Sequence, residues 1–260
     1  MIYIKSALQI EVMRKAGALL YEVLAELRQA IKPDMTTKDL DDIAEKLIRD
    51  RNSIPSFLGY NGFPASLCTS INEQVVHGIP SKDVVLHEGD VLSVDCGLIY
   101  DGWQSDSAFT VGVGEISPEK QKLIDVTEQC FFVGARQAIK GNRLHDIGHA
   151  IQELAESHGY GVIRELVGHG IGREMHEDPS VPNFGKAGHG VRLREGMTLA
   201  VEPMISLKNP AVRELEDGWT VVTIDQSPCA HYEHTLAINE HGLPELLSYP
   251  GYCFAEVDRK

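Results

Sequence analysis

Two aspartates flank a predicted tight turn and could together bind a cation. Asp95 lies inside an apolar run, where an ionised carboxylate is costly unless it is paired or bound to a metal. Asp101-Gly102 is a strong hairpin signal, and a two-residue turn there would pair Gly97 with Asp106. Asp95 would then lie diagonal to Asp106, with Cβ atoms roughly 7–8 Å apart. This spacing suits carboxylates that reach a pair of ions, and the simpler alternative is two solvent-facing aspartates on an edge hairpin.

The second half of the chain carries two further carboxylates in apolar segments. Glu202 follows a short apolar run, 107 residues after Asp95. Glu233 lies in a segment whose alternation puts His231, Glu233 and Thr235 on one face. Four carboxylates across one cleft would repel each other and raise one another's pKa values. Two divalent cations would offset these charges, and oxygen-rich ligation favours a harder ion than a thiolate site would.

A histidine in a glycine-rich loop could complete such a centre. His169 stands between Gly168 and Gly170, which let the backbone approach a metal or a substrate closely. Arg173 occupies the place of the last glycine of a dinucleotide fingerprint, so that motif is excluded. A lone histidine is more often structural. Because His176 follows seven residues later, the pattern favours a functional role.

The elements that must position these groups occur twice along the chain. Caps and apolar periodicity predict helices at 6–32, 37–51, 117–141 and 144–158, and strands near 91–94, 107–110, 196–201, 219–223 and 232–238. The pentapeptide at 28–32 recurs letter for letter at 136–140. This order predicts an α/β (α+β) fold made of a duplicated helix-helix-strands unit. The halves would span about 1–115 and 116–260 of one domain, 1–260.

Composition excludes several classes of function. The 260 residues are 43% hydrophobic and carry a formal charge of −14, which argues against nucleic acid as a substrate. The apolar stretches fall short of a membrane span, and the start lacks the features of a signal peptide. The five cysteines are widely spaced and odd in number, which argues against a disulfide framework and a zinc knuckle. We therefore expect a cytoplasmic protein.

Nine short motifs occur in an order and spacing that are together very specific. They are Leu58–Pro64, Ser70–Glu73, Val76–Pro80, Val94–Gly97, Gly102–Asp106, Gly168–Gly172, His176-Glu177, Val201–Met204 and Tyr232–Thr235. In these motifs the chain resembles type I methionine aminopeptidases over nearly its whole length. The resemblance implies the pita-bread fold, with two pseudo-symmetric halves around a central antiparallel sheet.

The resemblance also implies a dinuclear metal centre. The five ligands that it assigns are Asp95, Asp106, His169, Glu202 and Glu233. Asp106 and Glu233 would bridge two divalent ions. His169 and Glu202 would hold one ion, and Asp95 would chelate the other. Cobalt, manganese, iron and zinc all suit this mixed carboxylate and imidazole ligation.

Catalytic and substrate-binding groups follow from the same resemblance. The ions would polarise the scissile carbonyl and acidify a water, whose proton Glu202 would accept. His176 would donate to the carbonyl oxygen, and His77 would contact the scissile nitrogen or the bound peptide. The methionine side chain would enter an apolar S1 pocket. Its expected walls are Phe57, Tyr60, Phe63, Cys68, Met175 and Trp219.

Three positions in or near the expected S1 pocket depart from the common bacterial pattern. Many bacterial relatives carry cysteine, histidine and phenylalanine where this chain has Phe57, Asn61 and Met175. The expected activity is removal of the initiator methionine from nascent chains near the ribosome when the second residue is small. A monomer of the minimal bacterial type is expected. Two rivals share the fold: a prolidase or aminopeptidase P, which usually has an additional N-terminal domain, and a non-catalytic peptide-binding module, which typically loses metal ligands.

Overall fold

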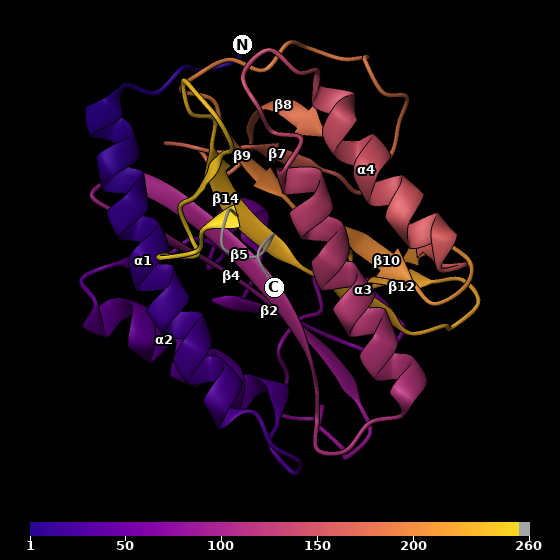
Figure 1. The fold of residues 1–260 in the computed structure, drawn as a ribbon. Helices are drawn as coiled ribbons and strands as arrows, with labels where there is room; N and C mark the ends of the chain where they lie inside the picture. The colour runs from indigo at the N-terminus through magenta and orange to yellow at the C-terminus, as the bar shows by residue number, and fades with distance from the viewer. Residues whose placement is uncertain (255–260) are drawn as a thin grey trace.

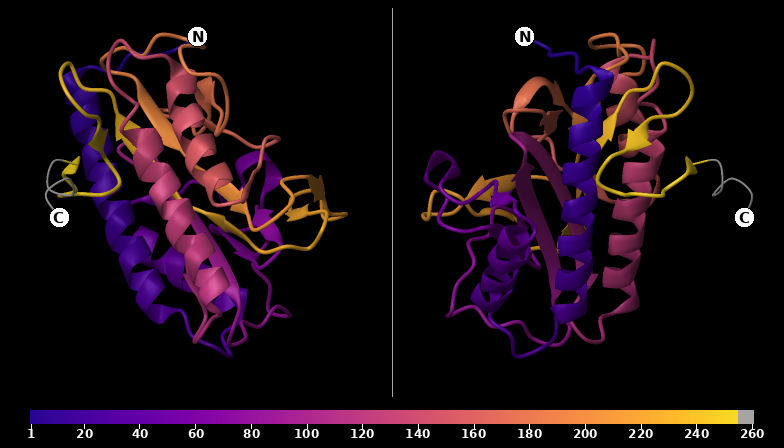
Figure 2. Two further views of the ribbon diagram at one scale, coloured as in Figure 1. Left: turned by 45° about the vertical axis from the view of Figure 1, so that its right-hand side comes forward. Right: turned by 90° about the vertical axis from the view of Figure 1, so that its left-hand side faces the viewer.

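A large antiparallel sheet, covered by helices on one face, organises the computed structural model, which describes residues 1–254 (Figure 1). The helices are α1 (Ala7–Ala30), α2 (Thr37–Asp50), α3 (Pro118–Ala135) and α4 (Leu144–Ser157), and a 3-10 turn, η1, spans Tyr60–Gly62. Both α1 and α3 stand on the same side of the strands (Figure 2). The predicted α/β fold class is confirmed.

The strands lie in one nine-stranded sheet and two three-stranded sheets within residues 1–254. They are β1 (Ile54–Pro55), β2 (Leu67–Ile71), β3 (Gln74–Val76), β4 (Val91–Tyr100), β5 (Trp103–Gly112), β6 (Gly161–Val162), β7 (Gly168–Gly170), β8 (Glu177–Val181), β9 (Thr198–Val201), β10 (Met204–Ser206), β11 (Val212–Glu214), β12 (Val221–Thr223), β13 (Cys229–His231), β14 (Glu233–Ala237) and β15 (Glu245–Leu246). The main sheet has the order β1-β4-β5-β14-β9-β7-β8, with β2 paired to β4 and β15 to β14. Strands from both halves therefore meet at β5 and β14.

Local sequence signals explain where the helices begin and end. Ser6 caps α1 in a capping box with Gln9, and Ser117 caps α3 with Pro118 at its first position. Gly159, with φ +78°, closes α4. The prediction that the third helix reaches residue 141 was wrong, because α3 ends at Ala135. There the chain tightens into i→i+3 hydrogen bonds, which release the 136–140 segment from the helix.

The β4–β5 hairpin has the register that its turn residues predict. Tyr100 pairs with Trp103 and Gly97 with Asp106, around Asp101-Gly102. Asp101 and Gly102 have φ of 49° and 73°, the left-handed values that a type I′ turn requires. The second acidic pair, Glu202 and Glu233, does not lie on a tight hairpin like that of the first pair. Strands β9 and β14 are neighbours, but the chain between them runs through β10 to β13 instead of a tight turn.

The buried carboxylate of Asp41 holds the start of strand β2. Asp41 on α2 accepts hydrogen bonds from the backbone N–H groups of Ser66 and Leu67, at 2.8 and 3.0 Å. These bonds satisfy both the buried acid and the start of β2, which leads directly into Cys68. No helix within residues 1–254 combines the length and apolar character that a membrane crossing requires.

Candidate active site

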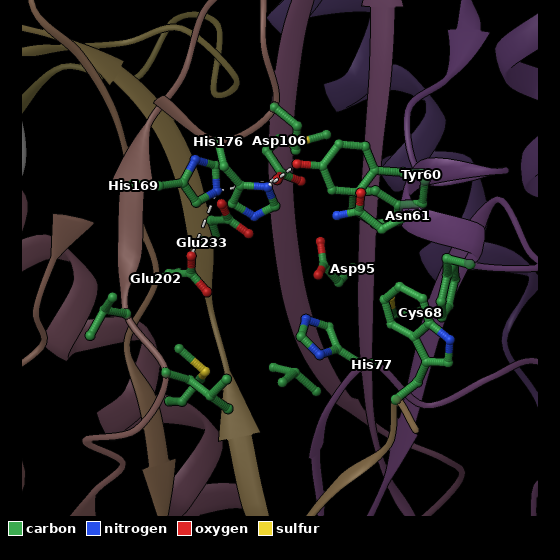
Figure 3. Close-up of a pocket in the computed structure, with 18 residues that line it drawn as sticks. Tyr60, Asn61, Cys68, His77, Asp95, Asp106, His169, His176, Glu202 and Glu233 are labelled. Atoms are coloured by element: carbon green, nitrogen blue, oxygen red, sulfur yellow. Dashed lines mark hydrogen bonds and ion pairs between the residues drawn. The ribbon is translucent and has the colours of Figure 1, made fainter. Parts of the chain in front are cut away.

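One cavity of about 300 Å³ is lined by residues from both halves of the chain. The structure brings all five predicted metal ligands to its wall (Figure 3). They come from adjacent strands of both halves: Asp95 on β4, Asp106 on β5, Glu233 on β14, Glu202 directly after β9 and His169 on β7. The strand order β4-β5-β14-β9-β7 is therefore what assembles the cluster.

His169 lies close to two carboxylates of this cluster without a hydrogen bond to either. Nε2 of His169 lies 3.7 Å from Oδ2 of Asp106 and 3.8 Å from Oε1 of Glu202. Ligand atoms of Asp106, His169 and Glu233 all lie within 4.8 Å of one another. Separations of this size are too long for hydrogen bonds, and they are the spacing of ligands around a common ion.

Backbone contacts hold the acidic strands in place. The Thr235 hydroxyl accepts from the Asp106 N–H at 3.0 Å and donates to the Asp106 carbonyl at 2.9 Å. The Ser107 hydroxyl donates to the Glu233 carbonyl at 2.7 Å. Side-chain hydrogen bonds from both strands therefore join β5 to β14. These contacts leave the acidic side chains little freedom to move apart.

The four carboxyl groups have pKa values above the ordinary range. Burial, reinforced by the charge of Glu202, raises the pKa of Asp95 to about 7, and burial raises the pKa of Glu202 to about 8. Burial also raises the pKa values of Asp106 and Glu233 well above their usual range. One oxygen each of Asp95, Asp106 and Glu233 is buried without a hydrogen-bond partner among residues 1–254. Such oxygens fit divalent cations.

The glycine-bordered loop presents His169 in one tautomer. Its Nδ1–H donates to the Gly170 carbonyl at 2.9 Å, so the lone pair of Nε2 faces the carboxylates. Burial lowers the pKa of His169 to about 4, which keeps the ring neutral. A Cβ on Gly170 would lie 2.2 Å from the Asp178 carbonyl oxygen, so glycine is required for this close approach.

His77 sits across the cavity from His169, as Figure 3 shows. It adopts a left-handed φ of 61°, which costs about 1–2 kcal/mol for a residue with a Cβ. Its ring meets the Trp219 indole edge to face, at a centroid distance of 6.3 Å. Burial lowers the pKa of His77 to about 4, so this imidazole is neutral above pH 5. The left-handed backbone conformation of His77 thus presents a neutral imidazole to the cavity that holds the acidic cluster.

His176 lies at the mouth of the cavity in a loop that a buried ion pair secures. Lys5 Nζ lies 2.5 Å from Oε2 of Glu177, and both side chains are at most 5% exposed. The other Glu177 oxygen accepts from the backbone N–H of Arg173 at 3.0 Å. The His176 ring lies over His169 with a centroid distance of 4.3 Å. The N-terminal segment thus supports the loop that carries His176.

The predicted S1 residues form the apolar side of the same cavity. Phe63 and Trp219 meet edge to face at 5.0 Å, and Cys68 packs against Phe63. Burial raises the pKa of the Cys68 thiol well above its usual value, so it remains a neutral apolar group. Met175 reaches over Gly97, where a Cβ would lie 2.9 Å from its Cε. Because Gly97 has no side chain, Met175 has room to pack there as part of the pocket wall.

Several residues near the site were given no role from the sequence. The additional cavity walls are Asn61, Val76, Leu166, Val167 and Met204. The four apolar residues among them carry no sequence signal that separates a pocket wall from core. His231 also lies against the acidic cluster, 3.6 Å from Glu202 and 3.8 Å from Glu233. The strand alternation that puts His231 and Glu233 on one face is the sequence pattern that indicates this position.

Known proteins of similar sequence and structure define the family. The model of metallopeptidase family M24 matches residues 11–240. The chain is 57% identical to a methionine aminopeptidase from Clostridium acetobutylicum, over 95% of this chain and 99% of the relative. It superimposes on the crystal structure of the Thermotoga maritima methionine aminopeptidase with a TM-score of 0.93 and 46% identity, covering 95% and 99% of the two chains. The chain therefore belongs to metallopeptidase family M24, and within it to the methionine aminopeptidases.

The rival prolidases share only the fold. The Xaa-Pro dipeptidase from Bacillus anthracis aligns with a TM-score of 0.75 at 20% identity, covering 96% of this chain but 63% of the dipeptidase. A likeness at this level of identity shows the fold alone. The predicted pita-bread architecture is confirmed by both kinds of neighbour, while the relatives named above at 46% and 57% identity are methionine aminopeptidases.

Proposed function

We propose that this protein removes the initiator methionine from nascent polypeptides whose second residue is small. The observation that carries this proposal is a single cavity with two unlike walls. One wall holds four carboxylates and His169, and the other is an apolar pocket bordered by Phe63, Cys68 and Trp219. A hydrolytic centre next to a pocket for one apolar side chain is the arrangement that an aminopeptidase for methionine needs.

The residues fit a pair of divalent ions. Buried carboxylate oxygens without hydrogen-bond donors are stabilised by cations, and one neutral imidazole points its lone pair at them. Asp95, Asp106, His169, Glu202 and Glu233 would hold the ions. When bound, divalent ions polarise a substrate carbonyl and make a water more acidic. Cobalt, manganese, iron and zinc are the candidates for this ligand set.

The protein's own groups would complete the hydrolysis of the peptide bond. Glu202 would take a proton from the attacking water and release it later to the leaving amine. His176 would donate a hydrogen bond to the scissile carbonyl oxygen as negative charge develops there. His77, neutral and held against Trp219, would contact the scissile nitrogen or the next residue of the peptide.

Side-chain chemistry explains the selectivity for methionine at the first position. The pocket between Tyr60, Phe63 and Trp219 offers aromatic edges, with which a thioether makes favourable contacts. Phe57 and Met175 replace a smaller thiol and a rigid ring of many bacterial relatives, so the pocket is lined by a bulkier ring on one side and a flexible chain on the other. An unbranched side chain fits between them without displacing either.

The cellular setting follows from the substrate and from the cysteines. We place the protein in the cytoplasm, as a monomer that meets nascent chains near the ribosome. All five cysteines, at positions 68, 96, 130, 229 and 253, are free thiols, which suits a reducing compartment. The formal charge of −14 argues against extensive contacts with RNA phosphates.

A matched peptide series tests the proposal. Metal-reconstituted protein is compared on Met-Ala, Met-Gly, Met-Lys, Met-Glu and Xaa-Pro peptides of otherwise equal sequence, by kcat/KM. We expect efficient cleavage of Met-Ala and Met-Gly, and poor cleavage of Met-Lys and Met-Glu, because a long second side chain collides with the wall near His77. Replacing the first methionine by leucine or norleucine should lower kcat/KM by the equivalent of about 1–3 kcal/mol. Equal cleavage of Met-Ala and Met-Lys, or faster cleavage of Xaa-Pro, would overturn it.

A further inference from the structure

His231 is a buried imidazole whose hydrogen-bonding capacity is not used within residues 1–254. The residue is 1% exposed, and neither ring nitrogen has a hydrogen-bond partner there. Its Nε2 lies 3.6 Å from Oε2 of Glu202 and 3.8 Å from Oε2 of Glu233. Leaving a buried polar group unsatisfied costs about 1–3 kcal/mol, so this orientation requires an explanation.

The neighbouring buried histidine shows what a structural role looks like in this fold. Nδ1 of His234 lies 2.9 Å from the hydroxyls of both Ser107 and Ser248, and its Nε2 is 3.3 Å from the Tyr232 hydroxyl. Every polar atom of that ring therefore has a protein partner. His231, three residues earlier on the adjoining strand, has none, although hydroxyl groups are available elsewhere in the core. Packing alone does not account for it.

Hydrogen bonds hold the backbone of His231 beside the acidic cluster. Its N–H donates to the Thr110 hydroxyl at 2.9 Å, and its carbonyl accepts from the same hydroxyl at 2.7 Å. Strand β13 also pairs with β10, with Met204 opposite His231. The ring is thus presented from a rigid strand position two residues before Glu233.

The distances are those of ligands around one ion. Two atoms that each lie about 2.1 Å from a common ion, at angles between tetrahedral and trigonal, are about 3.4–3.6 Å apart. Glu202, His231 and Glu233 offer ligand atoms that all lie within 4.8 Å of one another, as Asp106, His169 and Glu233 do. The two triads share Glu233, and each contains one imidazole.

We propose that Nε2 of His231 is a sixth protein ligand of the metal centre and binds the ion that Glu202 holds. This inference rests on the proposed dinuclear site. A second nitrogen ligand favours iron, cobalt or zinc over manganese. Imidazole nitrogen suits the first three ions, whereas manganese suits carboxylate and other oxygen ligands. It also explains why the strand keeps an otherwise unpartnered ring beside two carboxylates.

The test compares the wild-type protein with His231→Gln after loading with cobalt(II). Glutamine keeps a polar N–H that can donate to Glu202 but removes the imidazole nitrogen. We expect two bound ions in the wild type and hyperfine-shifted proton resonances from two ligating imidazoles. In His231→Gln one set of imidazole resonances should disappear, and calorimetric affinity for one of the ions should fall by roughly 10²-fold or more. His189→Gln, at an exposed loop position, is the matched control and should change neither reading.

The outcomes separate the inference from the function that it rests on. Two bound ions with only one set of shifted imidazole resonances in the wild type would overturn the role of His231 alone, even if the variant failed to fold. Wild-type metal affinity in His231→Gln would do the same, because a hydrogen bond to Glu202 would then suffice. A wild-type chain that binds no cobalt would overturn the dinuclear site itself.

Discussion

The phenolic oxygen of Tyr60 lies 2.8 Å from Nδ1 of His176, and the two rings have centroids 5.4 Å apart. This contact joins the S1 wall to the residue at the cavity mouth, across 116 positions of sequence. Burial raises the pKa of Tyr60, so the phenol stays protonated, and its O–H donates this hydrogen bond when Nδ1 of His176 carries no proton. His176 then carries its own proton on Nε2, the nitrogen left to donate to a substrate carbonyl.

Tyr60→Phe should reduce catalysis while preserving substrate binding. The phenyl ring keeps the shape of the S1 pocket, but His176 loses the hydrogen bond that selects its tautomer. We expect kcat on a Met-Ala peptide to fall by roughly tenfold or more, with little change in KM or in bound metal. Tyr21→Phe, on α1, is the control for loss of a hydroxyl. A rise in KM with unchanged kcat would mean that Tyr60 contributes only to the pocket.

Asp106→Asn should abolish both activity and the binding of two metal ions. The residue would serve both ions, and an amide lacks the negative charge that offsets them. Metal analysis after dialysis and peptide turnover measure the two effects. Asp101→Asn, in the hairpin turn five residues away, makes the same chemical change outside the cavity, and asparagine tolerates its φ of 49°. Retention of two tightly bound ions and normal turnover by Asp106→Asn would contradict the bridging role.

His77→Ala should reduce turnover by about 10² or more and leave metal content intact. The ring lies outside the ligand set and is held against Trp219 at the substrate side of the cavity. Because its pKa is about 4, the ring acts as a neutral group, and no loss of activity from its titration is expected above pH 5. His87→Ala, at an exposed site, is the control. Loss of metal from His77→Ala would instead identify His77 as a ligand.

Removing the metal should make the stability of the protein fall with rising pH. The pKa values of Asp95, about 7, and Glu202, about 8, lie above the ordinary values near 4. The folded metal-free chain therefore retains protons that the unfolded chain has released. The stability from the neutral acids is complete below about pH 4 and is lost as the pH rises through 7 to 8.

Thermal unfolding of the chelator-treated protein between pH 6.5 and 8.5 checks this sign, above the range in which buried histidines with lowered pKa values, such as His77 and His169, contribute the opposite slope. The Tm should be lower at pH 8.5 than at pH 6.5, and added divalent metal should raise the Tm more at the higher pH, because bound ions require deprotonated ligands. A metal-free protein whose Tm rises steadily over this range would show that other ionisable groups dominate its stability. The same scan on Asp101→Asn controls for surface charge.

Local features of this protein were predictable from the sequence because their causes are local. The capping box of Ser6 with Gln9 and the Asp101-Gly102 turn each depend on residues only a few positions apart. The hairpin register then placed Asp95 diagonal to Asp106 without knowledge of the rest of the chain. The end of α3 at Ala135 was missed, because the repeated pentapeptide at 136–140 continues the apolar pattern after the helical hydrogen bonds have ended.

Only the tertiary structure decided which groups face one another across the halves. The order β5-β14-β9-β7 brings His169 within 3.8 Å of Glu202, and the long path from β9 to β14 carries His231 to the same place. Lys5 meets Glu177 across 172 positions, and Tyr60 meets His176 across 116. Residue spacing contains no information on such distances, because they depend on strand pairing and on the course of connections far apart in the chain. The sequence by itself therefore determined the elements and the types of chemical group, whereas packing determined the geometry in which those groups meet.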